Sequence, residues 1–225
     1  MQKAASAVLD EQDGIRYAIA TGDQRDGIVR VLSESFAREP MAAALGISAR
    51  DLAGLIERFM PECMANGLSV VAVPLEESRT VAGAFVCRDY KSPLPAGVPD
   101  DFPWFLPVAH ALGTVNEAYG ATRADLQPGD AVDLWMVGVS EARFTRRGIA
   151  SQLFGLCAGT AQAHGFRRCV TECTGHYSQT AARRAGFAES ARLAYSEFRF
   201  EGRAVFANVP EPHTHLILYE RELSA

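Results

Sequence analysis

The chain has 225 residues, of which 48% are hydrophobic and 22% charged, so we expect one large or two small domains with a sizeable core. The formal net charge of −5 gives no electrostatic reason to expect a nucleic-acid partner, and it fits a cationic substrate better than an anionic one. No apolar run is long enough to cross a bilayer and the five cysteines contain no CxxC pair, so we expect buried thiols in a cytoplasmic protein without a membrane anchor, a disulfide framework or a metal site.

The first half of the chain mixes strand and helix patterns. Residues 1–12 lack the apolar core of a signal peptide, and we expect a flexible leader ahead of a single domain at 13–225. The apolar patterns predict, in chain order, a strand at 14–21, helices around 28–36 and 52–60, antiparallel strands at 68–75 and 80–90, a proline-rich loop at 91–103 and a helix at 104–120. Four aromatic residues suit either an aromatic amine pocket or the core: Tyr90, Trp104, Phe105 and Tyr119.

The second half alternates strand and helix more regularly. The patterns predict a strand at 131–139, a helix from 149 to about 165, a strand at 168–173, a short helix at 178–187 and strands at 193–200 and 214–221. Gly186 suits the left-handed position that ends a helix. The β-α-β unit at 131–174 favours one parallel strand pair between antiparallel hairpins. The sequence therefore predicts a mixed sheet in an α/β or α+β domain.

The turn between the strand at 131–139 and the following helix carries Arg146, Arg147 and Gly148. A helix N-terminus offers free backbone N–H groups, and its dipole favours an anion such as phosphate. No GK[ST] follows and no GxGxxG is present, which excludes a P-loop and leaves a dinucleotide fold unsupported. On local chemistry alone, an anion site and a solvated charged turn both remain open.

The stretch "VGVSEARFTRRGIASQLFGLCAGTAQAHGF", followed by "YSQTAARRAGF", resembles the GNAT superfamily of acyl-CoA-dependent N-acyltransferases. The segment 145–150 is similar to the family's (Q/R)-x-x-G-x-(G/A) turn, although Thr145 stands where the family has Gln or Arg, and Gly186 with Phe187 matches its Gly-Phe pair. The resemblance implies a mixed, mostly antiparallel sheet with a central splayed parallel strand pair and helices on both faces.

The same resemblance implies acetyl-CoA as the co-substrate. The family's turn holds the CoA pyrophosphate, its strand supplies a backbone N–H for the oxyanion from the segment 136–138, and the splay beside the strand at 168–173 holds the pantetheine arm. The residues that this carries over are Val137, Gly138, Val139, Arg146, Arg147, Gly148, Ile149, Ala150 and Ser151. The tyrosine that acts as general acid in many members is replaced here by Ala182.

A narrower resemblance concerns the segment "SFAREPMAAALGIS", which is similar to the insect-type arylalkylamine N-acyltransferases. It implies that Glu39 is the general base and that Thr174 and Ser178 are the paired hydroxyl residues, with Ser178 or the nearby Tyr177 as proton donor. The segment "PHTHLILYER" is also similar to that group and suggests His213 as a substrate-binding residue, and we expect Tyr177 to be a second one. The alternatives are a solvated Glu39 at a helix end, a capping role for Ser178 and a partnered surface position for His213.

These observations lead to one expected function and its rivals. We expect an acetyl-CoA-dependent N-acetyltransferase that transfers an acetyl group directly to a small primary amine in a ternary complex, as a monomer or homodimer. A protein or peptide amine, or an aminoglycoside, is the alternative acceptor. A CoA-binding sensor module without catalysis is the alternative from another class, because Ala182 and Thr145 depart from the family pattern.

Overall fold

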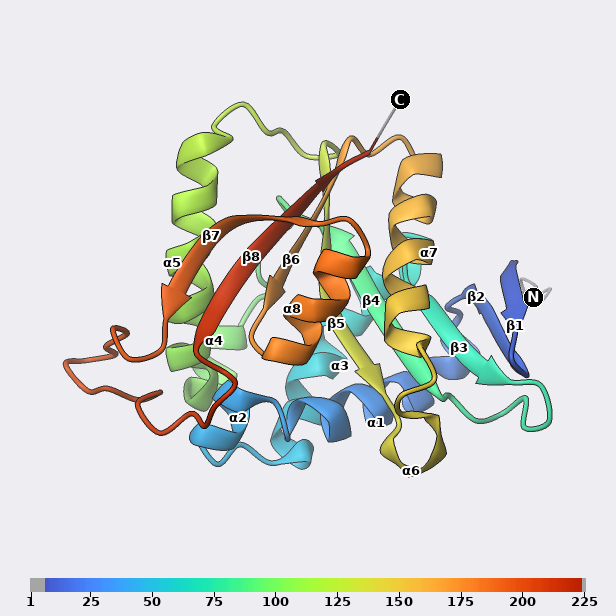
Figure 1. The fold of residues 1–225 in the computed structure, drawn as a ribbon, viewed down its shortest axis with the longest axis horizontal. Helices are drawn as coiled ribbons and strands as arrows, with labels where there is room; N and C mark the ends of the chain where they lie inside the picture. The colour runs from blue at the N-terminus through green and yellow to red at the C-terminus, as the bar shows by residue number, and fades with distance from the viewer. Residues whose placement is uncertain (1–6, 224–225) are drawn as a thin grey trace.

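The computed structural model describes residues 7–223, without the side chains of residues 141 and 142. Within these residues an eight-stranded sheet runs in the order β1-β2-β3-β4-β5-β6-β8-β7 (Figure 1). The strands are β1 (Val8–Gln12), β2 (Ile15–Ile19), β3 (Val70–Pro74), β4 (Gly83–Asp89), β5 (Ala131–Val139), β6 (Arg168–Cys173), β7 (Ala188–Ala194) and β8 (His215–Glu222). All neighbouring pairs in this described sheet are antiparallel except β5–β6, which confirms the predicted mixed fold class.

The helices cover both faces of the sheet (Figure 1). They are α1 (Arg25–Phe36), α2 (Pro40–Ala44), α3 (Ala49–Ala65), α4 (Val98–Asp101), α5 (Leu106–Thr122), α6 (Glu141–Phe144), α7 (Ile149–Ala163) and α8 (His176–Arg184), with 3-10 turns at Gly22–Gln24 and Pro103–Phe105. Side chains alternate between the two faces along each strand, so Val70 and Ala72 pack under α7, whereas Val71 and Val73 pack against α1 and α3. Helix α5 covers the β6–β8 end on the α1 face.

Strands β5 and β6 pair only at their beginnings. Residues 131–133 are in parallel register with residues 168–170, and beyond them the strands separate (Figure 1). A register shift in the β4–β5 ladder leaves Trp135 as an extra residue between Leu134 and Met136. Such a bulge increases the local twist and re-aims the neighbouring side chains. The splayed strand pair expected from the GNAT resemblance is therefore present, with the bulge at its opening.

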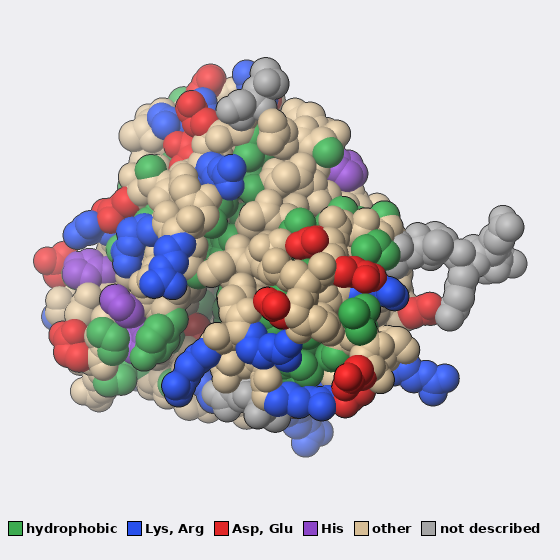
Figure 2. All heavy atoms as spheres, turned by 45° about the vertical axis from the view of Figure 1, so that its right-hand side comes forward, with side chains coloured by type: hydrophobic (Ala, Val, Ile, Leu, Met, Phe, Trp, Pro, Cys, Tyr) green, Lys and Arg blue, Asp and Glu red, His purple; other side chains and the backbone are tan. Residues whose placement is uncertain are grey.

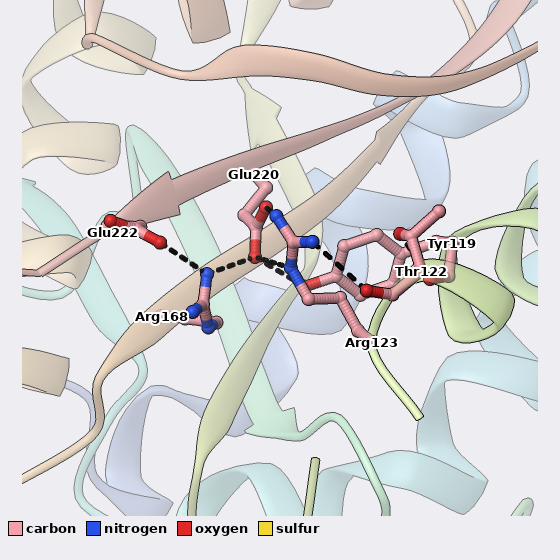
Figure 3. Close-up of polar contacts among 6 residues, drawn as sticks. All are labelled: Tyr119, Thr122, Arg123, Arg168, Glu220 and Glu222. Atoms are coloured by element: carbon pink, nitrogen blue, oxygen red, sulfur yellow. Dashed lines mark hydrogen bonds and ion pairs between the residues drawn. The ribbon is translucent and has the colours of Figure 1, made fainter. Parts of the chain in front are cut away.

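A buried carboxylate ties α5 to the sheet at the opposite end of these strands (Figure 3). Glu220 of β8 is 7% exposed, and it accepts hydrogen bonds from Tyr119 at 2.7 Å, Arg123 at 2.8 Å and Arg168 at 2.8 Å. Arg168 also bonds Glu222, at 2.7 Å. Charge-assisted bonds of this kind are stronger than neutral ones, so the cluster joins α5, β6 and β8 into one unit.

Several sequence predictions need correction. The flexible leader was placed at 1–12, but residues 8–12 form β1 at the sheet edge, and residues 1–6 lie outside the described part. Most β1 side chains are exposed, so no apolar pattern marks it. The strand predicted at 193–200 is β7 at 188–194, and Tyr195 and Phe198 instead enter the core beneath α5.

The loop predicted at 91–103 contains the short helix α4, and α2 and α6 were not predicted. Each has only four or five residues, too few for a helical period to appear. The five cysteines are all buried and unpaired, as expected. Among the described helices, none is long and apolar enough to cross a membrane.

Candidate active site

The opening between β5 and β6 leads into a cavity beneath α8. Its wall combines apolar side chains with a small set of polar ones. The polar members are Ser35, Glu39, Thr171, Glu172, Thr174 and Ser178, and Cys173 lies among them. A concave site with a few convergent polar groups is the usual form of a small-molecule site. Three of these residues, Glu39, Thr174 and Ser178, are the catalytic residues expected from the resemblance.

Glu39 reaches this cavity because it caps a short helix. Pro40 occupies the first position of α2, where its missing N–H costs nothing, and Glu39 precedes it in extended conformation. Its Oε2 accepts hydrogen bonds from the amides of Met41 and Ala42, both at 3.1 Å. Its Oε1 is buried and accepts no hydrogen bond from the described residues. The solvated helix end that we considered for Glu39 is therefore wrong.

The environment of Glu39 favours its neutral form. Burial raises the pKa of its carboxyl above the ordinary value, and the Thr174 side chain and the two capping amides only partly oppose this. Thr174 lies near the carboxylate without making a hydrogen bond to Oε1. A carboxylate with one fixed and one unsatisfied oxygen, poised above its usual pKa, has the properties of a general base.

The expected proton donors occupy different positions. The Ser178 hydroxyl donates to the carbonyl of Gly175 at 2.9 Å and lies beside the Cys173 thiol, whose pKa burial raises to about 12. Ser178 therefore lines the cavity while also completing the first turn of α8. Tyr177, in contrast, is 75% exposed and is not among the residues that line the cavity.

His213 packs at the start of α8, outside the cavity wall. Its Nδ1 accepts a hydrogen bond from the His176 amide at 3.1 Å, and its ring lies 5.7 Å from that of Tyr177. Burial and the charge of His176 lower its pKa. The structure thus brings His213 and Tyr177 together, but it does not place either side chain in the cavity, and their substrate-binding role stays a prediction.

The turn before α7 has the backbone form that an anion site requires. Gly148 has φ +76° and Arg146 has φ +61°, and the first intrahelical bond of α7 runs from Gln152 to Gly148. The amides of residues 149–151 therefore have no partner within the helix. Arg147 donates to the carbonyl of Asp13 and lies over the Phe144 ring.

Positive charge gathers on this side of the molecule despite the acidic composition of the whole chain. Figure 2 shows a hollow bordered by several Lys and Arg side chains. Arg146 and Arg147 of the turn and Arg183 and Arg184 of α8 are exposed. Such a field favours an anionic ligand and speeds its association.

The edge of β5 that faces the splay carries backbone groups that no neighbouring strand pairs; of these, the Val139 carbonyl accepts a hydrogen bond from the Ser35 hydroxyl at 3.2 Å. The Ser140 amide bonds the Ala82 carbonyl across to β4, and alternation along an antiparallel ladder gives Gly138 the same direction. The N–H groups of Val137 and Val139 then point toward β6. Gly138 matters sterically instead, because a Cβ there would lie 2.9 Å from Ser35 Oγ of α1.

An apolar pocket adjoins the cavity on the α1 face. Both spaces are bordered by Phe36, Glu39, Trp135, Glu172 and Thr174. The rest of the pocket wall comprises Ala42, Ile47, Leu52, Leu55, Trp104, Phe105, Val108, Leu112 and Met136. An apolar or aromatic body bound there would lie beside the Glu39 carboxylate.

Comparisons with known proteins bear on this geometry. No protein-family model and no curated protein sequence matches the chain. Arylalkylamine N-acetyltransferase 2 from Aedes aegypti superposes with TM-score 0.79 at 18% identity, over 94% of this chain and 100% of that one. The C-terminal condensation domain of Ebony, in complex with β-alanyl-dopamine, superposes with TM-score 0.81 at 15% identity, over 93% of this chain and 99% of that one. Drosophila melanogaster polyamine N-acetyltransferase superposes with TM-score 0.70 at 18% identity, over 93% of this chain and 100% of that one.

The chain has the GNAT fold. In this GNAT fold the bulged strand is β5, α8 follows the splayed β6, and the turn before α7 is the segment for which the resemblance predicts an anion-binding role. Ala182, at the position of the common tyrosine, is fully buried in the core, so no acid acts from there.

Some residues of the site escaped sequence reasoning. Trp135 was interpreted as part of a buried strand, yet the bulge turns it into the wall of both spaces. Glu172 also borders the cavity and the apolar pocket. The only sequence pattern that could have indicated it is its place as a charged residue within the otherwise buried strand at 168–173. Of the four aromatic candidates, Trp104 and Phe105 line the apolar pocket, whereas Tyr119 is buried against Glu220.

Proposed function

We propose that this protein is an acetyl-CoA-dependent N-acetyltransferase that transfers the acetyl group directly to a small primary amine with an apolar body. One observation carries the proposal: the Glu39 carboxylate, with its unsatisfied Oε1, borders both the cavity between the splayed strands and the adjoining apolar pocket. The thioester would enter from the first space and the amine from the second. Glu39 thus lies where the two reactants would meet.

The chain offers matching groups for the pyrophosphate, the pantetheine arm and the thioester of acetyl-CoA. The α7 amides and the open turn around Gly148 suit the pyrophosphate, which needs several N–H donors and a close backbone approach. The free edge of β5 at Val137 and Val139 suits the amide groups of the pantetheine arm. A backbone N–H on this edge would stabilise the oxyanion as the carbonyl becomes tetrahedral.

The reaction then requires two proton transfers. Glu39 takes a proton from the substrate ammonium, through a water, which frees the nitrogen lone pair to attack the thioester carbon. The C–N bond forms, the tetrahedral intermediate collapses, and the C–S bond breaks. Ser178, which lines the cavity, gives its hydroxyl proton to the leaving thiolate, and the second proton lost from the nitrogen restores the Ser178 hydroxyl. A raised pKa of Glu39 reduces its mismatch with an ammonium group.

A thiol-release assay with acetyl-CoA over a panel of amines tests the proposal, together with thermal shift by acetyl-CoA alone. We expect acetyl-CoA to stabilise the protein and small amines with an apolar body to give turnover. Stabilisation without turnover on any amine would instead support a CoA-binding sensor. Turnover confined to peptides or aminoglycosides would reject the small-amine acceptor, and no stabilisation would contradict every CoA-based function.

A further inference from the structure

A second cavity opens behind Trp135 and contains carboxylates that the reaction above leaves unused. It lies between α5 and the paired beginnings of β5 and β6, and its polar wall includes Asp133 and Glu172. Phe105, Leu112, Trp135 and Glu172 border both this cavity and the apolar pocket. The two spaces are therefore neighbours that share a wall.

Asp133 is an unsatisfied buried acid. Its Oδ1 is buried and has no hydrogen-bond partner among the described residues. Glu172, by contrast, is held in place: its Oε1 accepts from Asn116 Nδ2 at 2.9 Å, and Asn116 Oδ1 accepts from the Tyr90 hydroxyl at 2.8 Å. A buried polar atom without a partner costs free energy, so something is expected to satisfy Asp133.

The nearby cations do not compensate these acids. The Arg88 guanidinium donates to the carbonyls of Ser92 and Pro93 and lies over the Phe59 ring at 5.3 Å. It also lies 3.9 Å from the Glu62 carboxylate, a further acid. Lys91 is exposed at the rim, with Nζ 5.7 Å from the centre of the Tyr90 ring.

The cavity wall thus carries two acids and two cations, but among the described residues neither cation forms an ion pair with Asp133 or Glu172. Burial, then the charge of Glu172, raises the pKa of Asp133, and Arg88 opposes this without reversing it. Burial likewise raises the pKa of Glu172. A cation that entered the cavity would relieve both effects.

We propose that the Asp133–Glu172 cavity binds a second, distal ammonium group of the acceptor, which makes aliphatic diamines the preferred substrates over monoamines of the same length. The inference rests on the proposed function for the identity of the reacting end. The reacting amine lies beside Glu39, the methylene chain packs in the apolar pocket, and the far ammonium lies near Trp135, whose ring face also attracts cations.

Calorimetric binding of α,ω-diamines and of the matched n-alkylamines, without CoA, tests the site independently of catalysis. We expect the best diamine to bind the native chain roughly tenfold tighter or more than its monoamine, since a buried charge-assisted contact has that effect. Asp133→Asn should bring the ratio near one. Asp125→Asn, an exposed position with the same loss of charge, should keep it.

The ratio of kcat/KM for the diamine to kcat/KM for the monoamine is the second readout. It should fall to near one in Asp133→Asn and stay at the native value in Asp125→Asn. We expect the Asp133→Asn variant to fold, because the substitution removes a buried charge that no ion pair compensates. Glu172→Gln is a second test of the site, since the glutamine side-chain oxygen can still accept the hydrogen bond from Asn116. Equal binding of diamine and monoamine, an unchanged ratio in both variants, or a preference for phenolic amines would overturn the proposal. Diamine binding that depends on Asp133 without turnover would support this site and reject the proposed reaction.

Discussion

Glu39 has a structural role and, in the proposed mechanism, a chemical one as well. Its Oε2 caps α2, and this bond to two amides fixes the orientation of the carboxyl group so that Oε1 remains unsatisfied. A catalytic group positioned by backbone contacts loses little entropy when the substrate arrives. The raised pKa follows from the same burial. If Glu39 is the base, the rate of acetyl transfer must depend on pH through the ionisation of its carboxyl group.

We predict that kcat/KM falls as the pH decreases through the raised pKa of Glu39, because only the ionised carboxylate accepts a proton. This limb should lie above the ordinary glutamate pKa of about 4.3. The ammonium of the substrate gives a separate limb at higher pH. A profile measured with Glu39→Gln should keep the substrate limb and lack the acidic one; an unaltered acidic limb would assign it to another group.

At the scale of elements, two local departures from regular structure build the site. The bulge at Trp135 shifts the β4–β5 register, so the edge groups of Val137 and Val139 face the splay. The left-handed Gly148 then turns the chain so that α7 begins at the mouth of the same opening. A uniform ladder and a smooth turn would place neither set of N–H groups there.

We predict that Gly148→Val weakens acetyl-CoA binding roughly tenfold or more, since a branched residue is strained at φ +76° and its side chain crowds the approach to the amides. Equilibrium binding of acetyl-CoA measures this. Arg146→Ala should have a smaller effect.

Gly165→Val is the matched control for Gly148→Val. Gly165 has φ +86° beyond the other end of α7, and a Cβ there also meets no atom within 4 Å. The control should lose stability in a similar way and keep its affinity for acetyl-CoA. Equal losses of affinity in the two variants would contradict an anion site at the turn.

At the scale of the molecule, the Glu220 cluster holds α5 on the sheet, and α5 supplies one wall of the apolar pocket (Figure 3). Burial raises the pKa of Glu220, but the bonds from Arg123, Tyr119 and Arg168 outweigh it and leave the pKa below the ordinary value. A lowered carboxyl pKa adds stability above the unfolded-state pKa, and this contribution disappears as the pH falls through the folded-state pKa.

We predict that Glu220→Gln lowers the free energy of unfolding by about 2 kcal/mol at neutral pH, because the arginines keep their positions without the charge that pairs them. Urea unfolding between neutral pH and pH 3 measures the difference, which should shrink in acid. Glu222→Gln is the control, since Glu222 also bonds Arg168 but its side chain is 73% exposed. Similar losses in both variants would show that burial of Glu220 is not the cause.

The sequence predicted the sheet class, the hairpin of β3 and β4 and the β5-α7-β6 unit, because each has a long apolar period. It misplaced β7, whose mostly exposed residues show no clear alternation, and it did not predict the bulge at Trp135, which depends on pairing with β4. Glu39 came from a resemblance at the Glu-Pro pair, since α2 is too short to show a period. Asp133 and Glu172 meet only through the pairing of β5 with β6, so no local pattern indicated their cavity.

The rate of acetyl transfer by Glu39→Gln, measured beside its acetyl-CoA affinity, tests the central claim most directly. The amide oxygen can still cap α2, so the fold and the CoA site should persist. We predict a fall in kcat/KM of roughly a hundredfold or more with an unchanged acetyl-CoA affinity, as expected for removal of a general base. Ser48→Ala, which removes the cap of α3, controls for capping loss and should keep its rate. Undiminished turnover in a folded Glu39→Gln variant would contradict the account.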